Sequence, residues 1–306
     1  MPMAFLAGGG QMTRVWVVGE ALIDLIPVDG QARVPMVGGG PANTAKAVSR
    51  LGYETSFIGG ISSDDYGHAI DAELTGSGVD LSLVHRGDLP TALAIATIGA
   101  DGSARYDFEL EGTTTFSFNQ SWLPKSNPDV IHVGSVATLL EPGASELLAW
   151  VSSKTAPVVF DPNVRPSIQG KKEVYRAAVE RWIDVSSIVK LSEDDLDWLY
   201  GHESIVKTWF EHGVSLVIIT RGEKGMSAIT SDFTVNVPAT PVDVIDTVGA
   251  GDTIGAVIVE GILRYGISGL NGEKLFSVLE RAAKAASITC SRAGANPPWR
   301  AELDEV

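Results

Sequence analysis

The segment "DTVGAGDTIGA", residues 246–256, decides the fold of this chain. Residues 241–246 alternate as a strand does, and from Thr253 onward the chain is apolar nearly all round, which is typical of a buried helix. The pattern predicts a glycine turn between a strand and a helix, with Asp252 at the helix start. Because glycines let a ligand approach the backbone closely, this turn is the first candidate site.

The glycine spacing separates three kinds of binding loop. A Walker A loop needs GxxxxGK followed by Ser or Thr, and the sequence has no such string. A Rossmann fingerprint needs glycines two and three residues apart, whereas Gly249, Gly251 and Gly255 are two and four apart. An anion hole needs only unpaired N–H groups at a helix N-terminus, reached past small residues. The alternative is a tight turn on which Asp252 caps the helix, and the segment alone leaves both interpretations open.

The composition restricts the partners of the protein. The 306 residues carry a net charge of −15 and no cluster of Lys and Arg, which argues against nucleic acid as a partner. A single cysteine, Cys290, allows no internal disulfide and favours a reducing compartment. Residues 1–11 lack the basic start of a signal peptide, and no apolar run approaches the roughly 18 residues of a membrane span. We therefore expect a cytoplasmic protein that does not bind membranes.

Strand-like and helix-like segments alternate along most of the chain. Helix-like stretches such as residues 43–52 and 171–184 separate the apolar runs, which predicts βαβ units around a largely parallel sheet buried on both faces. His132 lies inside one of these runs, and we expect it to be a core histidine. The strand-like runs are residues 15–19, 55–60, 129–134, 157–162, 187–192 and 215–222.

Two segments break this alternation. Residues 22–37 and 91–112 each show strand-like alternation around a "DG" turn signal, which predicts two hairpins. Neither hairpin has a helix of its own to cover it. We expect them to form a small accessory sheet that stands off the main body as a lid over a cleft. Surface hairpins without a function are the alternative.

Two further glycine runs are candidate binding loops. "VGGGPANTA", residues 37–45, joins the first hairpin to a helix, and its Asn43 offers both a donor and an acceptor. The alternative is a flexible joint in which Asn43 caps the helix. "TRGEKG", residues 220–225, follows the strongest strand-like run, and open α/β sheets bind ligands at the ends of their strands. An ordinary exit from the strand is the alternative there.

Taken together, residues 38–52 and 246–256 resemble the two signatures of the ribokinase-like (PfkB) carbohydrate kinase family. The resemblance extends from Arg14 to Trp299. Within the family, the chain is most similar to the bacterial fructokinases, through residues 104–113, 160–166, 190–201 and 290–299.

The resemblance implies a fold and an activity. The fold would be one ribokinase-like domain over residues 13–300, a three-layer α/β/α sandwich with a mostly parallel central sheet and a small β-sheet lid. Residues 1–12 would be an extension. The activity would be ATP-dependent transfer of the γ-phosphoryl group, with Mg²⁺, to the primary hydroxyl of a ketohexose. Fructose is the expected sugar, fructose 6-phosphate the expected product, and a homodimer through the lid the expected assembly.

The resemblance also assigns roles to single residues. Asp252 would accept the proton of the sugar hydroxyl. The N–H groups of Ala250, Gly251 and Asp252, which follow Gly249 in the same catalytic turn, would face the charge developing on the phosphoryl group. The positions that match sugar-binding residues are Asp24, Gly39, Gly40 and Asn43, with Arg105 and Arg165 as basic candidates. The positions on the nucleotide side are Lys190, Glu193, Thr220, Gly222, Gly225, Ala286, Ser287 and Cys290.

The resemblance also implies two ion sites, and the sequence departs from the family pattern at two positions. Glu193 matches a position near Mg²⁺, through water, and Asp246 matches a site for a monovalent cation such as K⁺. Lys190 stands where ribokinases usually have Asn, and Val248 stands where many members have Thr. The alternatives are a solvated helix start for Lys190 and Glu193, and a surface ion pair for Arg165.

Three rival functions remain at this point. The first is another kinase of the same fold, acting on 2-keto-3-deoxygluconate or a nucleoside, because one sequence does not resolve the sugar pocket. The second is a dinucleotide-dependent oxidoreductase, against which the glycine spacing speaks. The third is a sugar-binding protein without catalysis, against which the intact Asp252 speaks.

Overall fold

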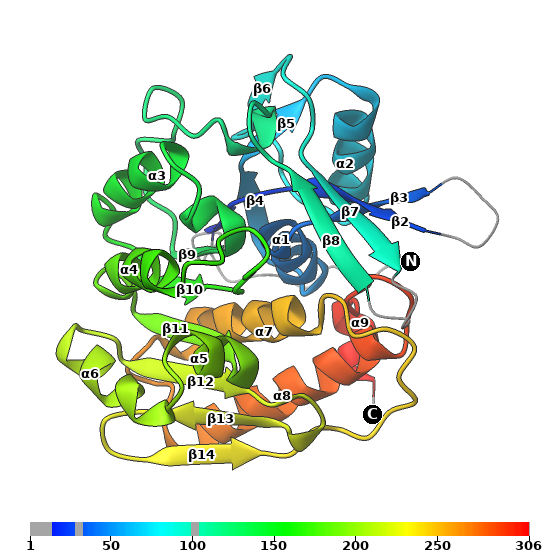
Figure 1. Cartoon of the computed structure of the whole chain (residues 1–306). Coiled ribbons are helices and arrows are strands. Elements are labelled where there is room, and N and C mark those ends of the chain that lie inside the picture. Colours follow the sequence, from blue (N-terminus) through cyan, green and yellow to red (C-terminus); the bar gives the residue numbers. More distant parts are fainter. Residues whose placement is uncertain (1–13, 28–32, 99–103, 306) are drawn as a thin grey trace.

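The computed structural model describes residues 14–27, 33–98 and 104–305, and its centre is an eight-stranded sheet (Figure 1). All six apolar runs that were predicted as strands lie in this sheet and pair parallel, in the order β12-β11-β10-β9-β1-β4. Two strands that we did not predict, β13 and β14, extend the sheet antiparallel at one edge. The strands are β1 Arg14–Val18, β4 Glu54–Ile58, β9 Val130–Gly134, β10 Val158–Asp161, β11 Ile188–Ser192, β12 Leu216–Thr220, β13 Met226–Ile229 and β14 Thr234–Val237.

Helices cover both faces of this sheet. Successive residues of a strand point to opposite faces, so Val15 and Val17 of β1 pack in one core cluster while Trp16 and Val18 pack in the other. The first cluster includes residues of α1, α2, α7 and α8, and the second includes residues of α3, α4, α5 and α6, which confirms the three-layer sandwich. The helices are α1 Gly40–Arg50, α2 Asp65–Gly76, α3 Gly143–Ser152, α4 Lys172–Ile183, α5 Glu193–Leu199, α6 Val206–Glu211, α7 Ala250–Tyr265, α8 Gly272–Cys290 and α9 Arg300–Asp304. Short 3-10 turns are η1 Thr114–Phe116, η2 Ser135–Thr138, η3 Glu203–Ile205 and η4 Gly222–Lys224.

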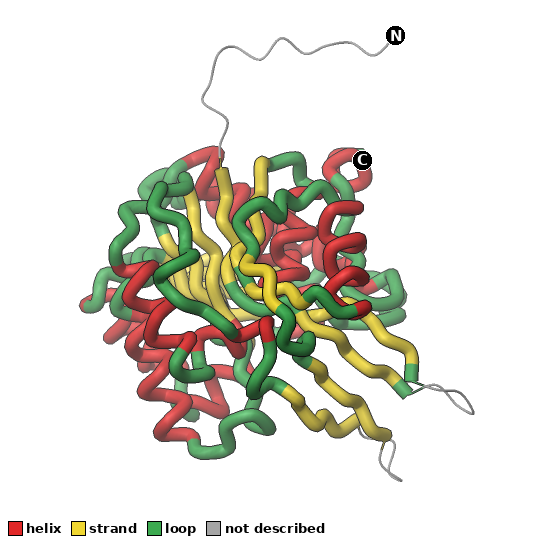
Figure 2. The backbone as a smooth tube through the Cα atoms, turned by 90° about the horizontal axis from the view of Figure 1, so that it is seen from above, coloured by secondary structure: helices red, strands yellow, loops and turns green. Residues whose placement is uncertain are grey.

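The two predicted hairpins form a separate four-stranded sheet in the order β3-β2-β7-β8, which lies beside the main body (Figure 2). Both pair antiparallel, as expected, and the parallel pair β2–β7 joins them. The two "DG" turns lie outside the described residues. Contrary to expectation, one helix, α2, contacts β2 and β3. The strands are β2 Leu22–Ile26, β3 Val34–Gly38, β7 Leu93–Ile98 and β8 Ala104–Glu109, and a short parallel pair is β5 Gly60–Ser62 and β6 His85–Gly87.

The segment before the glycine turn differs from the prediction. Residues 241–246 form no strand, although their sequence alternates. The chain has left the sheet after β14, and the N–H groups of Ile245 and Asp246 donate to the carbonyl of Cys290 at the end of α8. Val244 and Ile245 are 61% and 67% exposed, so neither contributes to the core. The glycine turn therefore joins a surface loop, not a strand, to the buried helix α7.

The carboxyl ends of the parallel strands meet at one edge of the large sheet, as the topology requires. Near that edge lie the start of α7 and the small sheet (Figure 1). No helix among the described residues is long and apolar enough to cross a membrane. The proposed extension, residues 1–12, lies outside the described residues, and the bounds 13–300 for a single domain stay a prediction.

Candidate active site

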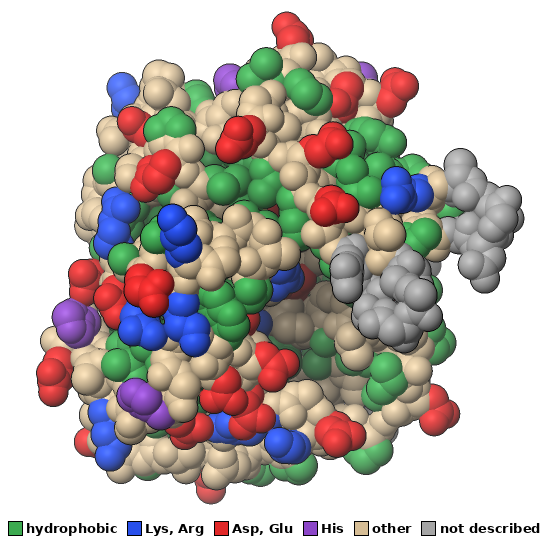
Figure 3. All heavy atoms as spheres, in the orientation of Figure 1, with side chains coloured by type: hydrophobic (Ala, Val, Ile, Leu, Met, Phe, Trp, Pro, Cys, Tyr) green, Lys and Arg blue, Asp and Glu red, His purple; other side chains and the backbone are tan. Residues whose placement is uncertain are grey.

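A cavity of about 460 Å³ opens between the carboxyl edge of the large sheet, the start of α7 and the small sheet. In the space-filling view the molecule is hollowed at its centre, with basic side chains visible inside the hollow (Figure 3). The lining includes residues of two glycine segments, 37–45 and 246–256, and of both the large and the small sheet. They are Glu20, Leu22, Asp24, Gly39, Gly40, Asn43, Ala94, Tyr106, Phe108, Ser135, Val136, Asn163, Arg165, Ser167, Lys190, Thr247, Val248, Gly249, Gly251 and Asp252.

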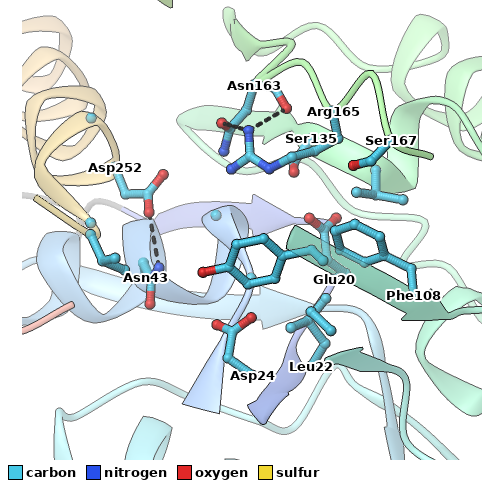
Figure 4. Close-up of a pocket in the computed structure, with 18 of the residues that line it drawn as sticks. Glu20, Leu22, Asp24, Asn43, Phe108, Ser135, Asn163, Arg165, Ser167 and Asp252 are labelled. Carbon is cyan, nitrogen blue, oxygen red and sulfur yellow. Dashed lines mark hydrogen bonds between the residues drawn. The ribbon is translucent and has the colours of Figure 1, made fainter. Parts of the chain in front are cut away.

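Asp252 is not a helix cap. The N-cap of α7 is Gly249, which has a φ of 80°, and Asp252 lies inside the first turn and is 8% exposed. Its Oδ2 accepts a hydrogen bond of 2.9 Å from Nδ2 of Asn43 (Figure 4). This bond joins the glycine segments at residues 37–45 and 246–256. Burial raises the pKa of Asp252 to about 6, and the charge of Lys190 opposes that rise. A carboxylate with this pKa is a better proton acceptor than an ordinary aspartate, and it is still ionised at neutral pH.

Two glycines bring backbone close to the polar side chains that line the cavity. A methyl group on Gly40 would lie 2.8 Å from Nδ2 of Asn163 and 3.2 Å from Oδ1 of Asp252. A methyl group on Gly251 would lie 2.9 Å from Nζ of Lys190. The cavity beside Asp252 is therefore open only because these positions lack side chains.

The N–H groups at the start of α7 are partly free. Ala250 donates a weak hydrogen bond of 3.3 Å to the carbonyl of Thr247, whereas Gly251 and Asp252 have no acceptor among the described residues. Free N–H groups at a helix N-terminus attract anions. We predicted that the N–H groups of Ala250, Gly251 and Asp252 would serve an anion, and the geometry is compatible with that role mainly through Gly251 and Asp252.

A buried ion pair lies next to this turn. Nζ of Lys190, on β11, is 2.6 Å from Oδ2 of Asp161, at the end of β10, and the two side chains are 6% and 5% exposed. The carboxylate of Asp161 raises the pKa of Lys190 although burial opposes it. The alternative of a solvated helix start is therefore wrong for Lys190, which is buried in an ion pair and lines the cavity.

Asp24 and Arg165 line the cavity from different sides, Asp24 from the small sheet and Arg165 from the segment after β10 (Figure 4). Asp24 lies on β2, and burial raises its pKa to about 6, while the charge of Arg165 lowers it. Nη1 of Arg165 donates to both the carbonyl and the side-chain oxygen of Asn163, at 3.1 and 2.7 Å (Figure 4). Arg165 therefore lines the cavity, and within the described residues it forms no surface ion pair.

Several lining residues were not predicted. Glu20 is 1% exposed and accepts a hydrogen bond of 3.0 Å from the N–H of Ala137 in η2, and burial raises its pKa. Ser135 and Asn163 have φ values of 59° and 40°, a region that favours glycine, and such strain clusters at functional sites. Glu20, Ser135 and Asn163 each follow the end of a parallel strand, so the rule that we applied to Thr220 would also have pointed to them.

Apart from Lys190, the predicted nucleotide-side residues do not line the cavity. Thr220 ends β12, Gly222 lies in the η4 turn after it, and Gly225 has a φ of 92°. The other members lie half-buried on the last turns of α8, and they are Ala286, Ser287 and Cys290. The described cavity lining thus contains the predicted sugar-side residues except Arg105, together with Lys190, and it contains none of the other nucleotide-side residues.

Three further predicted site residues are not among the described residues that line the cavity. Glu193 begins α5 and forms ion pairs with Arg221 and, at 3.4 Å, with Lys224, so it is not a free solvated carboxylate. Both oxygens of Asp246 accept backbone N–H groups, from Val248 at 3.0 Å and from Gly294 at 2.9 Å. Arg105 lies on β8 opposite Thr97, and its side chain is outside the described part of the chain.

His132 is the core histidine that the sequence predicted. It is 2% exposed, and burial lowers its pKa to about 4, so it is neutral at physiological pH. Neither ring nitrogen has a hydrogen-bond partner among the described residues.

Comparisons with known proteins agree with this geometry. Residues 12–302 match the model of the pfkB family of carbohydrate kinases. The chain is 37% identical to a fructokinase of Rhizobium leguminosarum bv. trifolii over 80% of this chain and 78% of that protein. It superimposes with a TM-score of 0.84 and 26% identity on a Vibrio cholerae O395 fructokinase bound to fructose, ADP and calcium, over 95% of this chain and 98% of that one. It also resembles an aminoimidazole riboside kinase of Salmonella enterica, with a TM-score of 0.81, 25% identity and the same coverage of both chains. The chain belongs to the pfkB family of carbohydrate kinases and has the ribokinase-like fold.

Proposed function

We propose that this protein is an ATP-dependent fructokinase, which transfers the γ-phosphoryl group to the primary hydroxyl of fructose and forms fructose 6-phosphate. The observation that carries the proposal is the buried carboxylate of Asp252, which borders both the free N–H groups of α7 and the polar cavity that contains Asp24. The names of the matched relatives support fructose as the sugar. The structure of the riboside kinase shows that this fold also serves other sugars, so the substrate requires a test.

The acceptor hydroxyl would meet Asp252 first. Asn43 holds Oδ2 of this carboxylate at 2.9 Å, which fixes its orientation and leaves Oδ1 towards Gly40. The hydroxyl proton would pass to Asp252 while the sugar oxygen bonds to phosphorus and the bond to the leaving ADP breaks. The free N–H groups of Gly251 and Asp252 would stabilise the negative charge on the phosphoryl oxygens.

The charges in the cavity favour a neutral sugar over a keto acid. Three carboxyl groups line the cavity, those of Glu20, Asp24 and Asp252, and they would repel an anionic substrate. The two cations of the lining are already committed in part, since Lys190 is paired with Asp161 and Nη1 of Arg165 donates to Asn163 and Val164. Hydroxyl groups, in contrast, can donate to carboxylates and accept from Arg165.

The magnesium ion would enter as part of the ATP substrate. Mg²⁺ is usually held by phosphates, water and one or two carboxylates. In the described parts of the chain no three His, Cys, Asp or Glu side chains are grouped to hold a metal ion. Because Arg221 and Lys224 engage the oxygens of Glu193, this residue fits only as a partner that contacts the ion through water. Thr220, Gly222, Gly225 and the end of α8 would hold the nucleotide, and a K⁺ site at Asp246 stays a proposal.

The small sheet would serve as a lid and as the contact between two copies of the chain. Its two hairpins lie over the cavity and contribute Asp24, Tyr106 and Phe108 to the lining. Closure would exclude water from the transferred phosphoryl group.

A cytoplasmic location of the protein agrees with the single cysteine of the sequence.

The test is an assay that couples ATP consumption to ADP detection, with fructose, ribose, 2-keto-3-deoxygluconate, glucose and adenosine as acceptors. We expect the highest kcat/KM with fructose. A keto acid or a nucleoside that is about ten times better than fructose, a difference of about 1.4 kcal/mol, would replace the proposed substrate. Reduction or oxidation of a nicotinamide cofactor by the protein would replace the proposed class of enzyme.

A further inference from the structure

The ion pair between Asp161 and Lys190 is almost completely buried. The side chains are 5% and 6% exposed, and taking two charges out of water costs several kcal/mol for each ion. Apolar side chains of similar volume often stabilise such a position equally well or better. The pair therefore points to a role that a purely structural core residue would not need.

Lys190 is placed against the anion-binding turn. A methyl group on Gly251 would lie 2.9 Å from Nζ, and the next nearest atom to that methyl would be Cε of the same lysine, at 3.9 Å. The ammonium therefore faces the glycine directly, and Lys190 lines the cavity that contains Asp252. A phosphoryl group bound at the free N–H groups of Gly251 and Asp252 would lie next to this charge.

The ammonium has unused hydrogen-bonding capacity. A lysine carries three N–H donors, and within the described residues Nζ of Lys190 donates only to Asp161. Two donors are left for oxygens of a ligand. Phosphoryl transfer has a loose transition state with charge spread over three equatorial oxygens, so a fixed cation at this place stabilises it.

Asp161 fixes the direction of the lysine side chain. It ends β10, next to β11 in the sheet, and its Oδ2 is the acceptor for Nζ at 2.6 Å. His132, on β9, also lies near Asp161, but it is neutral and donates no hydrogen bond to it. Lys190 is thus the cation that compensates Asp161, and Asp161 in turn holds the lysine in one orientation.

We propose that Lys190 is a catalytic residue whose ammonium contacts the phosphoryl group during its transfer, and that Asp161 is a positioning residue that directs this ammonium. The proposal rests on the proposed kinase function and deepens it. Lys190 stays protonated throughout, because the proton of the sugar hydroxyl goes to Asp252. The bond from the sugar oxygen to phosphorus forms as the bond from phosphorus to the leaving oxygen of ADP breaks.

The decisive variant removes both charges at once. Asp161→Asn combined with Lys190→Met leaves no unpaired buried charge, so the protein is expected to fold with an unchanged or higher melting temperature. Its kcat with fructose and ATP should fall about 100-fold or more, as for other groups that stabilise charge in a transition state. The KM for fructose should change little, because Asp24, Asn43 and Arg165 are untouched.

Single variants show whether Asp161 acts through Lys190. Asp161→Asn alone should lower kcat, and adding it to Lys190→Met should lower kcat no further, because residues that act as one unit are not additive. Glu260→Gln is the matched control: Glu260, on α7, is a carboxylate with a 2% exposed side chain that pairs with Arg264 and Arg281. This control should lower the melting temperature and leave kcat unchanged.

The outcomes separate this proposal from the kinase assignment. If the wild type phosphorylates fructose and the double variant keeps more than about a tenth of its kcat, which is above the range for losing a charge-stabilising group, the role of Lys190 is wrong. If Asp161→Asn mainly raises the Mg²⁺ concentration for half-maximal rate, Asp161 is a metal ligand and not a positioning residue. If the wild type phosphorylates no sugar, the proposed function itself is wrong.

Discussion

The two walls of the cavity are built differently. The phosphoryl wall, which we define as Asp161, Lys190 and the start of α7 with Asp252, belongs to the large sheet and its covering helix. Its three charged side chains belong to residues that are only 4%, 5% and 8% exposed. The sugar wall, which we define as β2, β3, β7 and β8, exposes Val34, Met36 and Tyr106 by 39%, 44% and 40%.

The difference follows from what each wall has to hold. Buried charges remain ionised only where partners are fixed around them, and the parallel strands and α7 supply that fixed frame. One face of the small sheet rests on a core cluster of few residues, including Leu22, Ala92 and Ala94, and among the described residues of this sheet only Ile23 of β2 is a fully buried member of the main cluster. Segments with few buried apolar contacts open most easily, so we expect chemistry on the rigid wall and substrate-dependent motion on the other.

The largest effect should come from the rigid wall, with Asp252→Asn. The amide keeps the size of the side chain but cannot accept the proton of the hydroxyl, so kcat should fall about 100- to 10,000-fold. Because the carboxylate does not cap α7, no capping energy is lost, and removal of a buried charge should keep or raise the melting temperature. Steady-state rates and a melting curve test both statements.

A result of the opposite kind would be equally informative. If Asp252→Asn retains more than about a tenth of the wild-type kcat, which is outside the usual range for loss of a general base, another group accepts the proton. If it lowers the melting temperature while kcat survives, Asp252 has a structural role despite its position.

A change on the sugar wall should affect binding and spare the chemistry. A methyl group on Gly38 would lie 2.1 Å from Oδ2 of Asp24, so Gly38→Ala must displace that carboxylate. Loss of a hydrogen bond to a charged group costs about 1.5–3 kcal/mol, and the KM for fructose should rise about 10- to 100-fold with kcat nearly unchanged. Gly76→Ala, where a methyl group would meet no atom within 4 Å, is the control and should leave both constants unchanged. A fall in kcat with constant KM would mean that the two walls are not separate.

The pH dependence of activity and of stability tests the comparison between the two walls. Asp252 and Asp24 lie on different walls, and both have a pKa raised to about 6. Activity should fall as the pH drops below about 6, since protonated Asp252 accepts no proton. For stability the sign is the reverse. The folded state binds a proton at Asp252 that the unfolded state releases between pH 3.8 and about 6, so wild-type stability falls as pH rises through this window.

This difference can be measured against Asp252→Asn. At pH 7 the ionised carboxylate costs on the order of 3 kcal/mol, so the variant should melt higher than the wild type there, and the gap should close near pH 4. A gap that is constant from pH 4 to pH 7 would show that Asp252 titrates normally.

The sequence predicted the rigid wall better than its surroundings. Buried parallel strands appear in the sequence as continuous apolar runs, so the large sheet was predictable. Glycines at the start of a helix indicate a close approach of the backbone to other groups, so the position of Asp252 at the start of α7 was predictable as well. Residues 241–246 were predicted as a strand because alternation does not reveal whether a partner strand is present. Here their N–H groups bond to the carbonyl of Cys290 instead.

Contacts between distant segments account for most of what the sequence did not reveal. Asp161 and Lys190 are 29 positions apart, and only the neighbouring order of β10 and β11 brings them together. The ion pair that engages Glu193 likewise depends on Arg221 at the end of β12. Residue types and spacings indicated candidate positions, but the partner that determines each charge state came from the topology.

The smallest expected effect is a change in hydrogen exchange on the sugar wall. If the small sheet closes on the substrate, backbone amides of β3 and β8 should exchange more slowly when fructose is saturating, because closure protects edge strands that are open in the free protein. Amides of β10 and β11 should not change, since these strands are buried with or without sugar. The pair β13–β14 is the control, because it is also antiparallel and lies at an edge of the large sheet. Equal exchange in β3 and β8 with and without fructose would mean that the sugar wall is as fixed as the phosphoryl wall.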